Sequence, residues 1–341
     1  MRLAALALGV AAALGCSIPD FTLRPADGAV TPDGSVVTPD MDVAPGPDSG
    51  VPPEDTGAPP VDTGEPPEDV PGPVDVPPVD VPPGAIPAAI SAALPAFDGA
   101  TTARVRELRA AGLARGNRAA VFAKIGDSIT EAGSFLSDVG NGWFTLGSYE
   151  WLRGTISYFS ATSLGDFNSF DRPSACAMGG WVSAQALEGD PDSALRRELN
   201  AIRPAYAIVM YGTNDVDRGG VDALQPNLER IAQIIEEFGT VPVLSTIPDR
   251  LDNTAAAAGV APINTAIRAL AASRHLPLID YWQAMQPLPR HGVSEDGIHP
   301  SVFLNMGDPE AGTFTDAGLM YGYNMRNLTA ILMLDRLRTL P

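Results

Sequence analysis

The chain has 341 residues, 45% of them hydrophobic, with a mean hydropathy of +0.05. This length allows one large domain or two small ones with a sizeable core. The net charge is −19, but residues 17–84 alone hold 14 acidic residues and one basic residue, so most of the acidity lies outside the globular part. The chain has no basic stripe, which argues against nucleic acid as a partner.

The first 16 residues, MRLAALALGVAAALGC, carry one charge, Arg2, followed by a short apolar run. This run is too short for a stable membrane span and is typical of a secretory signal peptide. Its ALGC end resembles a bacterial lipoprotein processing site, although Ala13 stands where that pattern usually has leucine. The resemblance implies that Cys16 carries a lipid anchor. Plain secretion with cleavage nearby is the alternative.

Export therefore predicts a location in the bacterial cell envelope, at the membrane surface, or outside the cell. We expect no further membrane span in the sequence. If Cys16 carries a lipid, Cys176 is the only other cysteine and no disulfide within the chain can form. The core must then hold the exported domain together.

Residues 17–84 are of low complexity, with proline every few residues and many acidic side chains. Proline blocks both helices and central strands, and such a segment cannot bury enough apolar surface to offset its ordering entropy. We expect a disordered, partly polyproline II linker between the signal peptide, residues 1–16, and a folded domain, residues 85–341.

The first helix of the globular part is expected in TTARVRELRAAGLARG, with Thr101 or Thr102 as its cap and Gly116 at its end. Short apolar runs at 119–125, 206–212, 241–247 and 276–280 predict strands. Helical patterns occupy 192–202, 224–239, 263–275 and 322–340. The alternation predicts an α/β fold with a parallel sheet covered on both faces. In such sheets, ligands bind outside the carboxyl ends of the strands.

Polar motifs follow the predicted strands at those ends. GDSIT contains Ser128, GTND contains Asn214, and SEDGIHPS contains Asp296 and His299. A serine hydroxyl is a weak nucleophile that needs an adjacent base, which His299 can supply. Asp296 lies three residues upstream, where a turn can fold its carboxylate onto the imidazole. The alternative for Ser128 is a helix cap at a strand end.

Together and in this order, the motifs resemble the sequence blocks of SGNH/GDSL hydrolases. GDSIT, GTND and DGIH match the first, third and last blocks, and the second-block glycine is Gly180, with Gly179 as the alternative. The resemblance covers roughly residues 118–340. It implies a flavodoxin-like three-layer α/β/α sandwich with about five parallel strands, and a serine esterase without metal or cofactor.

The resemblance also assigns roles to individual residues. It implies Ser128 as nucleophile, His299 as base and Asp296 as the residue that orients the base. The oxyanion hole would consist of the Ser128 and Gly180 N–H groups and the Asn214 amide, which are donors aimed at a developing negative charge.

Four other residues carry weaker signals. His275, near a helix end, is predicted to be structural. His291 lacks an acid three residues before it and is either structural or part of the pocket rim. Asp127 is predicted to accept a hydrogen bond that tethers its loop, and Cys176 to lie buried in a strand. Three scattered histidines do not favour a metal site.

The connection from Ser128 to Gly180 is long and rich in aromatic residues, most of which we expect in the core and one or two in a pocket wall. With export, it favours a short-acyl (acetyl) ester on a carbohydrate, and we expect a monomer. A lipase, lysophospholipase or thioesterase with the same triad is the alternative, as is a non-catalytic surface binding module. The aromatic residues are Phe135, Trp143, Phe144, Tyr149, Trp151, Tyr158, Phe159, Phe167 and Phe170.

Overall fold

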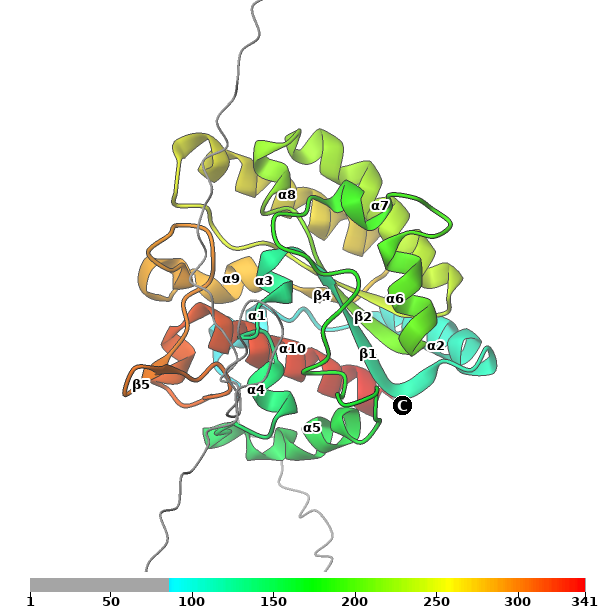
Figure 1. The fold of residues 1–341 in the computed structure, drawn as a ribbon, viewed down its shortest axis with the longest axis horizontal. Coiled ribbons are helices and arrows are strands. Elements are labelled where there is room, and N and C mark those ends of the chain that lie inside the picture. The colour runs from blue at the N-terminus through cyan, green and yellow to red at the C-terminus, as the bar shows by residue number, and fades with distance from the viewer. Residues whose placement is uncertain (1–85, 341) are drawn as a thin grey trace, which may run out of the picture. The chain divides into compact units, whose positions relative to one another are not determined.

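The computed structural model describes residues 86–340, and the structural statements below concern those residues (Figure 1). The predicted signal peptide, Cys16 and the predicted linker lie outside them. The strands are β1 (Arg118–Gly126), β2 (Pro204–Met210), β3 (Val241–Ser245), β4 (Leu278–Ile279), β5 (Leu304–Asn305) and β6 (Asp308–Pro309). The α-helices are α1 (Ala88–Ala92), α2 (Gly99–Ala114), α3 (Ser128–Glu131), α4 (Ser137–Gly140), α5 (Arg153–Ser160), α6 (Ala194–Ile202), α7 (Gly220–Glu237), α8 (Thr254–Ser273), α9 (Tyr281–Met285) and α10 (Gly322–Thr339). Short 3-10 turns are η1 (Gly147–Leu152), η2 (Ser183–Ala186), η3 (Asp215–Asp217), η4 (Pro289–Gly292) and η5 (Gly318–Met320).

Four of the strands form one parallel sheet in the order β1-β2-β3-β4. Each of them contains or overlaps one of the four apolar runs in the sequence. Every residue of β2 and β3 is buried. Such continuous apolar runs are expected for parallel strands that helices cover on both faces. The predicted α/β class is therefore confirmed.

The expected fifth strand is reduced to a single bridge beside β1. Ala177 pairs with Gly126 in parallel, and the Gly126 N–H donates to the Cys176 carbonyl over 3.0 Å. Pro173 precedes this segment and two glycines follow it, which leaves little chain able to extend the pairing. Cys176 is buried as predicted, but it does not lie in a full strand.

The chain passes from β1 to the bridge on one side and then crosses to β2 on the other. Such a switch point opens a crevice at the carboxyl ends of the strands. Figure 1 shows α6, α7 and α8 together on one side of the sheet and α5 and α10 on the other. The order of helix, sheet and helix makes three layers.

Helix α2 begins earlier than the sequence suggested. Its N-cap is Asp98, whose carboxylate accepts from the Thr101 N–H, so neither Thr101 nor Thr102 caps the helix. Aspartate is as good a cap as threonine, and the two threonines already lie in the first turn. The helix ends at Ala114, and Gly116 follows with φ +85°.

The aromatic connection largely fills the core, as predicted. Phe135, Phe159 and Phe170 are buried. Phe122 of β1 meets the Phe159 and Phe170 rings edge-on, with centroids 5.6 and 5.0 Å away. By contrast, Trp143 is 71% exposed and lines a cavity of about 470 Å³.

Helix α8 is long and apolar enough, by length and composition alone, to cross a membrane. The sequence analysis predicted no membrane span in this part of the chain. In the fold, α8 packs against the sheet layer through a buried face that includes Val260, Ile263 and Ile267. Core helices of this kind pass the same length and composition test, so the helix carries no argument for a span.

The start of the described chain is fixed to the C-terminal part of the domain. The Asp280 N–H donates to the Ala93 carbonyl over 2.7 Å. Arg336 of α10 donates to the carbonyls of Leu94 and Pro95 over 3.1 and 2.7 Å.

Candidate active site

Ser128 is the first residue of α3, and only Asp127 separates it from the carboxyl end of β1. Asp127 caps this helix, because its Oδ1 accepts from the Ile129 N–H over 3.0 Å. Gly126 makes the sharp change of direction possible. A Cβ at this position would lie 2.2 Å from the Thr130 hydroxyl and 2.5 Å from the Met210 carbonyl oxygen.

The structure brings Ser128, His299 and Asp296 together in one hydrogen-bonded chain. Ser128 Oγ lies 2.9 Å from His299 Nε2, and His299 Nδ1 lies 2.6 Å from Asp296 Oδ2. The first distance is a normal hydrogen bond, and the second is a short one. The opposite nitrogens of the imidazole therefore contact the hydroxyl and the carboxylate.

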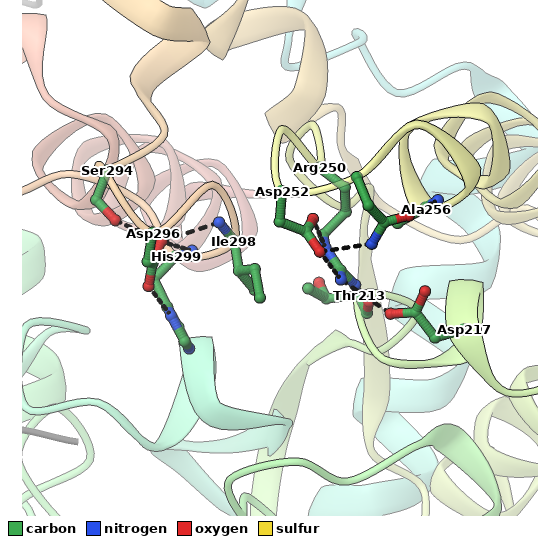
Figure 2. A network of polar contacts seen from close by, with 10 residues as sticks. Thr213, Asp217, Arg250, Asp252, Ala256, Ser294, Asp296, Ile298 and His299 are labelled. Atoms are coloured by element: carbon green, nitrogen blue, oxygen red, sulfur yellow. Dashed lines mark hydrogen bonds and ion pairs between the residues drawn. The ribbon is translucent and has the colours of Figure 1, made fainter. Parts of the chain in front are cut away.

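The Asp296 carboxylate is held by its own turn. Burial alone would raise its pKa, but hydrogen bonds from the Ser294 hydroxyl, from the Ile298 N–H and from the His299 ring and N–H lower the pKa to about 2. Asp296 is therefore ionised at neutral pH. Figure 2 shows these contacts around Asp296.

Gly297 allows the turn between Asp296 and His299 to close. Its φ is +75°, a conformation that favours glycine. A Cβ there would also lie 2.6 Å from the Asp252 backbone nitrogen.

Three groups in the segments that follow β1, the bridge at Ala177 and β2 can donate hydrogen bonds. As the first residue of α3, Ser128 has an N–H without a partner inside the helix. Asn214 Nδ2 donates one hydrogen to the Trp181 carbonyl over 2.9 Å, which leaves its second hydrogen. In the described part of the chain, no group accepts from the Gly180 N–H.

The two adjacent glycines differ in how their N–H groups are used. The Gly179 N–H donates to Glu131 Oε2 over 2.6 Å. Gly180 has φ +74° and open space where a Cβ would stand, and its carbonyl accepts from Arg218 over 3.0 Å. The predicted Gly180 thus retains a free N–H, whereas the alternative, Gly179, uses its N–H in the contact with Glu131.

Two buried acids support the loops around Ser128. Asp215 Oδ1 accepts from the Ser183 hydroxyl over 2.6 Å, which ties the turn after Asn214 to the turn after Gly180. Burial raises the pKa of Asp215. Burial likewise raises the pKa of Asp127 to about 6. Its Oδ2 has no hydrogen-bond partner among the described residues.

A scan against protein families matches residues 125–302 to the GDSL-like lipase/acylhydrolase family. The match covers more than half of the 341 residues and includes Ser128, Gly180, Asn214, Asp296 and His299. The chain belongs to this family. It is accordingly a hydrolase that acts on ester bonds.

Solved structures of family members are similar to this acylhydrolase at low identity. A GDSL-like lipase from Bacteroides thetaiotaomicron is 15% identical over 69% of this chain and 98% of its own, with a TM-score of 0.39. A catalytic mutant of an acetylxylan esterase from Geobacillus stearothermophilus is 15% identical over 63% of this chain and 92% of its own, with a TM-score of 0.40. No curated protein matches the chain.

The other histidines and the cysteine of this acylhydrolase lie apart from the Ser128 chain of hydrogen bonds. His275 follows the end of α8, as predicted. His291 is half exposed, and its Nδ1 lies 2.6 Å from Asp249 Oδ2. Burial raises the pKa of the Cys176 thiol to about 12, so it stays protonated in the core. The described residues contain no group of three or more His, Cys, Asp or Glu placed to hold a metal ion.

The sequence did not indicate Glu131 and Arg326, which contact the segments around Ser128, or Asp249, which pairs with His291 apart from them. Glu131 binds Gly179, and Asp249 binds His291. Arg326 is fully buried in α10, where it donates to the Ile129 carbonyl and the Thr130 hydroxyl of α3 over 2.5 and 2.8 Å. Asp249 lies 42 positions before His291 in the sequence, so no short motif could predict that the two side chains meet.

Proposed function

We propose that this chain is an exported serine esterase that hydrolyses carboxylic esters through an acyl-enzyme on Ser128. One observation carries the proposal: the continuous hydrogen-bonded chain from Ser128 Oγ through the His299 ring to Asp296, at 2.9 and 2.6 Å. With Asp296 ionised, Nδ1 of a neutral His299 carries the proton and Nε2 is free to accept one.

In the first half of the reaction, Ser128 Oγ attacks the ester carbonyl carbon and its proton passes to His299 Nε2. The tetrahedral intermediate collapses when the bond from carbon to the alcohol oxygen breaks. The leaving alkoxide takes the proton from His299. In the second half, water attacks the acyl-enzyme, gives its proton to His299, and releases the acid. The proton then returns to Ser128.

The negative charge on the carbonyl oxygen needs donors that are already in place. The Ser128 N–H, the Gly180 N–H and the second hydrogen of Asn214 Nδ2 are the groups that we assign to this role. The assignment is supported because each of these hydrogens lacks an acceptor among the described residues, whereas the Gly179 N–H donates to Glu131.

We further propose a carbohydrate ester with a short acyl group, such as acetyl, as the substrate. The support is the aromatic-rich connection between Ser128 and Gly180, in which Trp143 is 71% exposed. Trp143 and Phe144, with Glu310 and Thr313, line a cavity of about 470 Å³ that contains none of the triad residues. Aromatic rings beside carboxylate and hydroxyl groups suit the apolar faces and hydroxyl edges of a sugar.

For location, we propose a lipid anchor on Cys16 that holds the esterase at the membrane surface of the cell envelope. The support is the sequence pattern of residues 1–16 and the proline-rich, acidic segment that follows.

A hydrolysis profile on p-nitrophenyl esters with acyl chains of two to sixteen carbons tests the proposal. We expect the highest kcat/KM on the acetyl ester and no turnover by Ser128→Ala. A maximum at eight carbons or more would instead indicate a lipase or thioesterase. No turnover by the wild-type chain on any ester would favour the non-catalytic binding module.

A further inference from the structure

The guanidinium of Arg250 is buried and makes four hydrogen bonds, two to the turn that holds Asn214 and two to Asp252 in its own segment. Arg250 lies in the segment between β3 and α8 and is 4% exposed. Its Nη1 donates to the Thr213 carbonyl over 2.5 Å, and its Nη2 donates to Asp217 Oδ2 over 2.8 Å. Thr213 and Asp217 bracket Asn214 on both sides. Figure 2 shows this network beside the Asp296–His299 pair.

The same segment touches the turn that carries Asp296 and His299. Arg250 forms a two-point contact with Asp252, with Nε to Oδ1 at 2.7 Å and Nη2 to Oδ2 at 2.8 Å. Between these two residues, the Leu251 N–H donates to the Gly297 carbonyl over 2.7 Å. Gly297 also packs so closely on Asp252 that no side chain fits there.

The other end of the segment is fixed as well. Asn253 caps α8, because its Oδ1 accepts from the Ala256 N–H over 2.8 Å. Its amide also donates to Asp252 Oδ2 over 2.7 Å. Arg250 therefore joins two turns through a short segment that the start of a long helix holds in place.

We propose that Arg250 is a positioning residue that sets Asn214 relative to the Asp296–His299 turn. The inference rests on the roles proposed above for these residues. The planar guanidinium reaches the Asn214 turn and Asp252 at the same time, and a lysine could not make all four hydrogen bonds. Arg250 does not touch the reacting atoms. Arg250 affects the rate by holding the Asn214 amide in position. A displacement of about 1 Å in such a group can lower the rate by about 10²-fold.

The test measures kcat and KM on p-nitrophenyl acetate for Arg250→Lys and Arg250→Met, with melting temperatures beside them. We expect kcat to fall by about 10-fold for Arg250→Lys and about 10²-fold for Arg250→Met, with KM within about threefold. Asp217→Asn, at the exposed side of the network, should lower kcat by less than Arg250→Lys. If Arg250→Met does not fold, Arg250→Lys and Asp217→Asn still decide the question.

A double-mutant cycle with Asn214→Ala separates positioning from general damage. Without the Asn214 amide, Arg250→Lys has nothing left to misplace in that loop, so kcat should fall by no more than about threefold further. An equal fall in both backgrounds would overturn the proposal, as would an unchanged kcat in folded Arg250→Lys.

Arg274→Lys is the matched control. Arg274 pairs with Glu236 where α7 and α8 end. These helix ends precede β3 and β4, so the pair lies at the amino ends of the strands, and its replacement should leave kcat within about twofold. Ser128→Ala distinguishes the two failures. If Ser128→Ala is inactive while Arg250→Lys turns over like the wild type, the positioning role fails and the esterase proposal stands.

Discussion

Ser128 and His299 are 171 positions apart in the chain, yet Ser128 Oγ and His299 Nε2 lie 2.9 Å apart. The parallel sheet explains the meeting, because Ser128 lies two residues after the end of β1 and the turn with His299 folds back to the carboxyl ends of the strands. If these residues act as proposed, they should behave as a unit in mutagenesis.

Removing the nucleophile should leave little for the base to contribute. We expect Ser128→Ala to abolish nearly all esterase turnover, and Ser128→Ala/His299→Ala to lose little more, since losses within a triad are strongly non-additive. Initial rates on p-nitrophenyl acetate measure both. Independent, multiplying losses would contradict the prediction, and His275→Ala, at a helix end, serves as the control.

Asn214→Ala should reduce turnover without abolishing it, unlike Ser128→Ala, because the nucleophile and the base remain. The loss of one preorganised donor should lower kcat by about 10²–10³-fold, or about 3–4 kcal/mol of transition-state stabilisation. Steady-state kinetics with a matched Asn200→Ala control on α6 would show it. A kcat within threefold of the wild type would exclude Asn214 from the oxyanion hole.

The low pKa of Asp296 predicts the shape of the pH profile. Since that pKa is about 2, Asp296 stays ionised from pH 4 upwards and adds no limb to kcat/KM in that range. The reaction also needs a neutral imidazole that can accept the proton of Ser128. In Asp296→Asn, the ring loses the carboxylate that fixes its tautomer, so kcat should fall by about 10⁴-fold. A limb in the wild-type kcat/KM profile above pH 4 that disappears in Asp296→Asn would contradict this account.

Asp127 predicts a pH dependence of stability. Burial raises its folded-state pKa to about 6 from the usual value of 3.8, so the folded state binds the proton more tightly than the unfolded chain. Stability is therefore lost as pH rises from about 4 to about 6, by about 3 kcal/mol. The free energy of unfolding of Asp127→Asn minus that of the wild type should be larger at pH 7 than at pH 4 by about that amount. Urea unfolding at both pH values measures it. The exposed Asp222→Asn should show no such difference. A pH-independent effect of Asp127→Asn would show that the carboxyl is not the source.

The anchor can be tested apart from catalysis. Cys16→Ser should move the protein from the membrane fraction to the soluble exported fraction, while activity on p-nitrophenyl acetate stays within twofold. Immunoblots of separated fractions measure the first effect. If membrane association is unchanged, the anchor lies elsewhere.

The apolar runs and the motifs at their ends predicted most of the fold, because buried parallel strands leave a signal that needs no partner to be recognised. The starts of helices were harder to place. Helix α8 begins at Thr254, nine residues before the predicted pattern, where Asn253 supplies the cap and Pro262 lies inside the helix. The expected fifth strand failed for a local reason, the proline and glycines on either side of Cys176.

Short motifs also placed Ser128, Asn214, Asp296 and His299 on one edge. They could not show that Glu131 would occupy the Gly179 N–H, because that contact joins residues 48 positions apart. Nor could they single out Arg250, whose partners lie up to 37 positions away. Such contacts depend on how loops pack and leave no periodic pattern in the sequence.

If the proposed anchor on Cys16 holds the enzyme, the hydrogen bonds that fix Ala93, Leu94 and Pro95 have a mechanical consequence. A pull that reaches the domain through residue 86 would act on the packed side chains of Ile86 and Ile90 and on the hydrogen bonds from Arg336 of α10 and the Asp280 N–H. Neither Ser128 nor the turn with His299 takes part in these bonds. Drag on a bound polymer or movement of the membrane would thus load a buried helix, and the reacting groups would keep their alignment under tension.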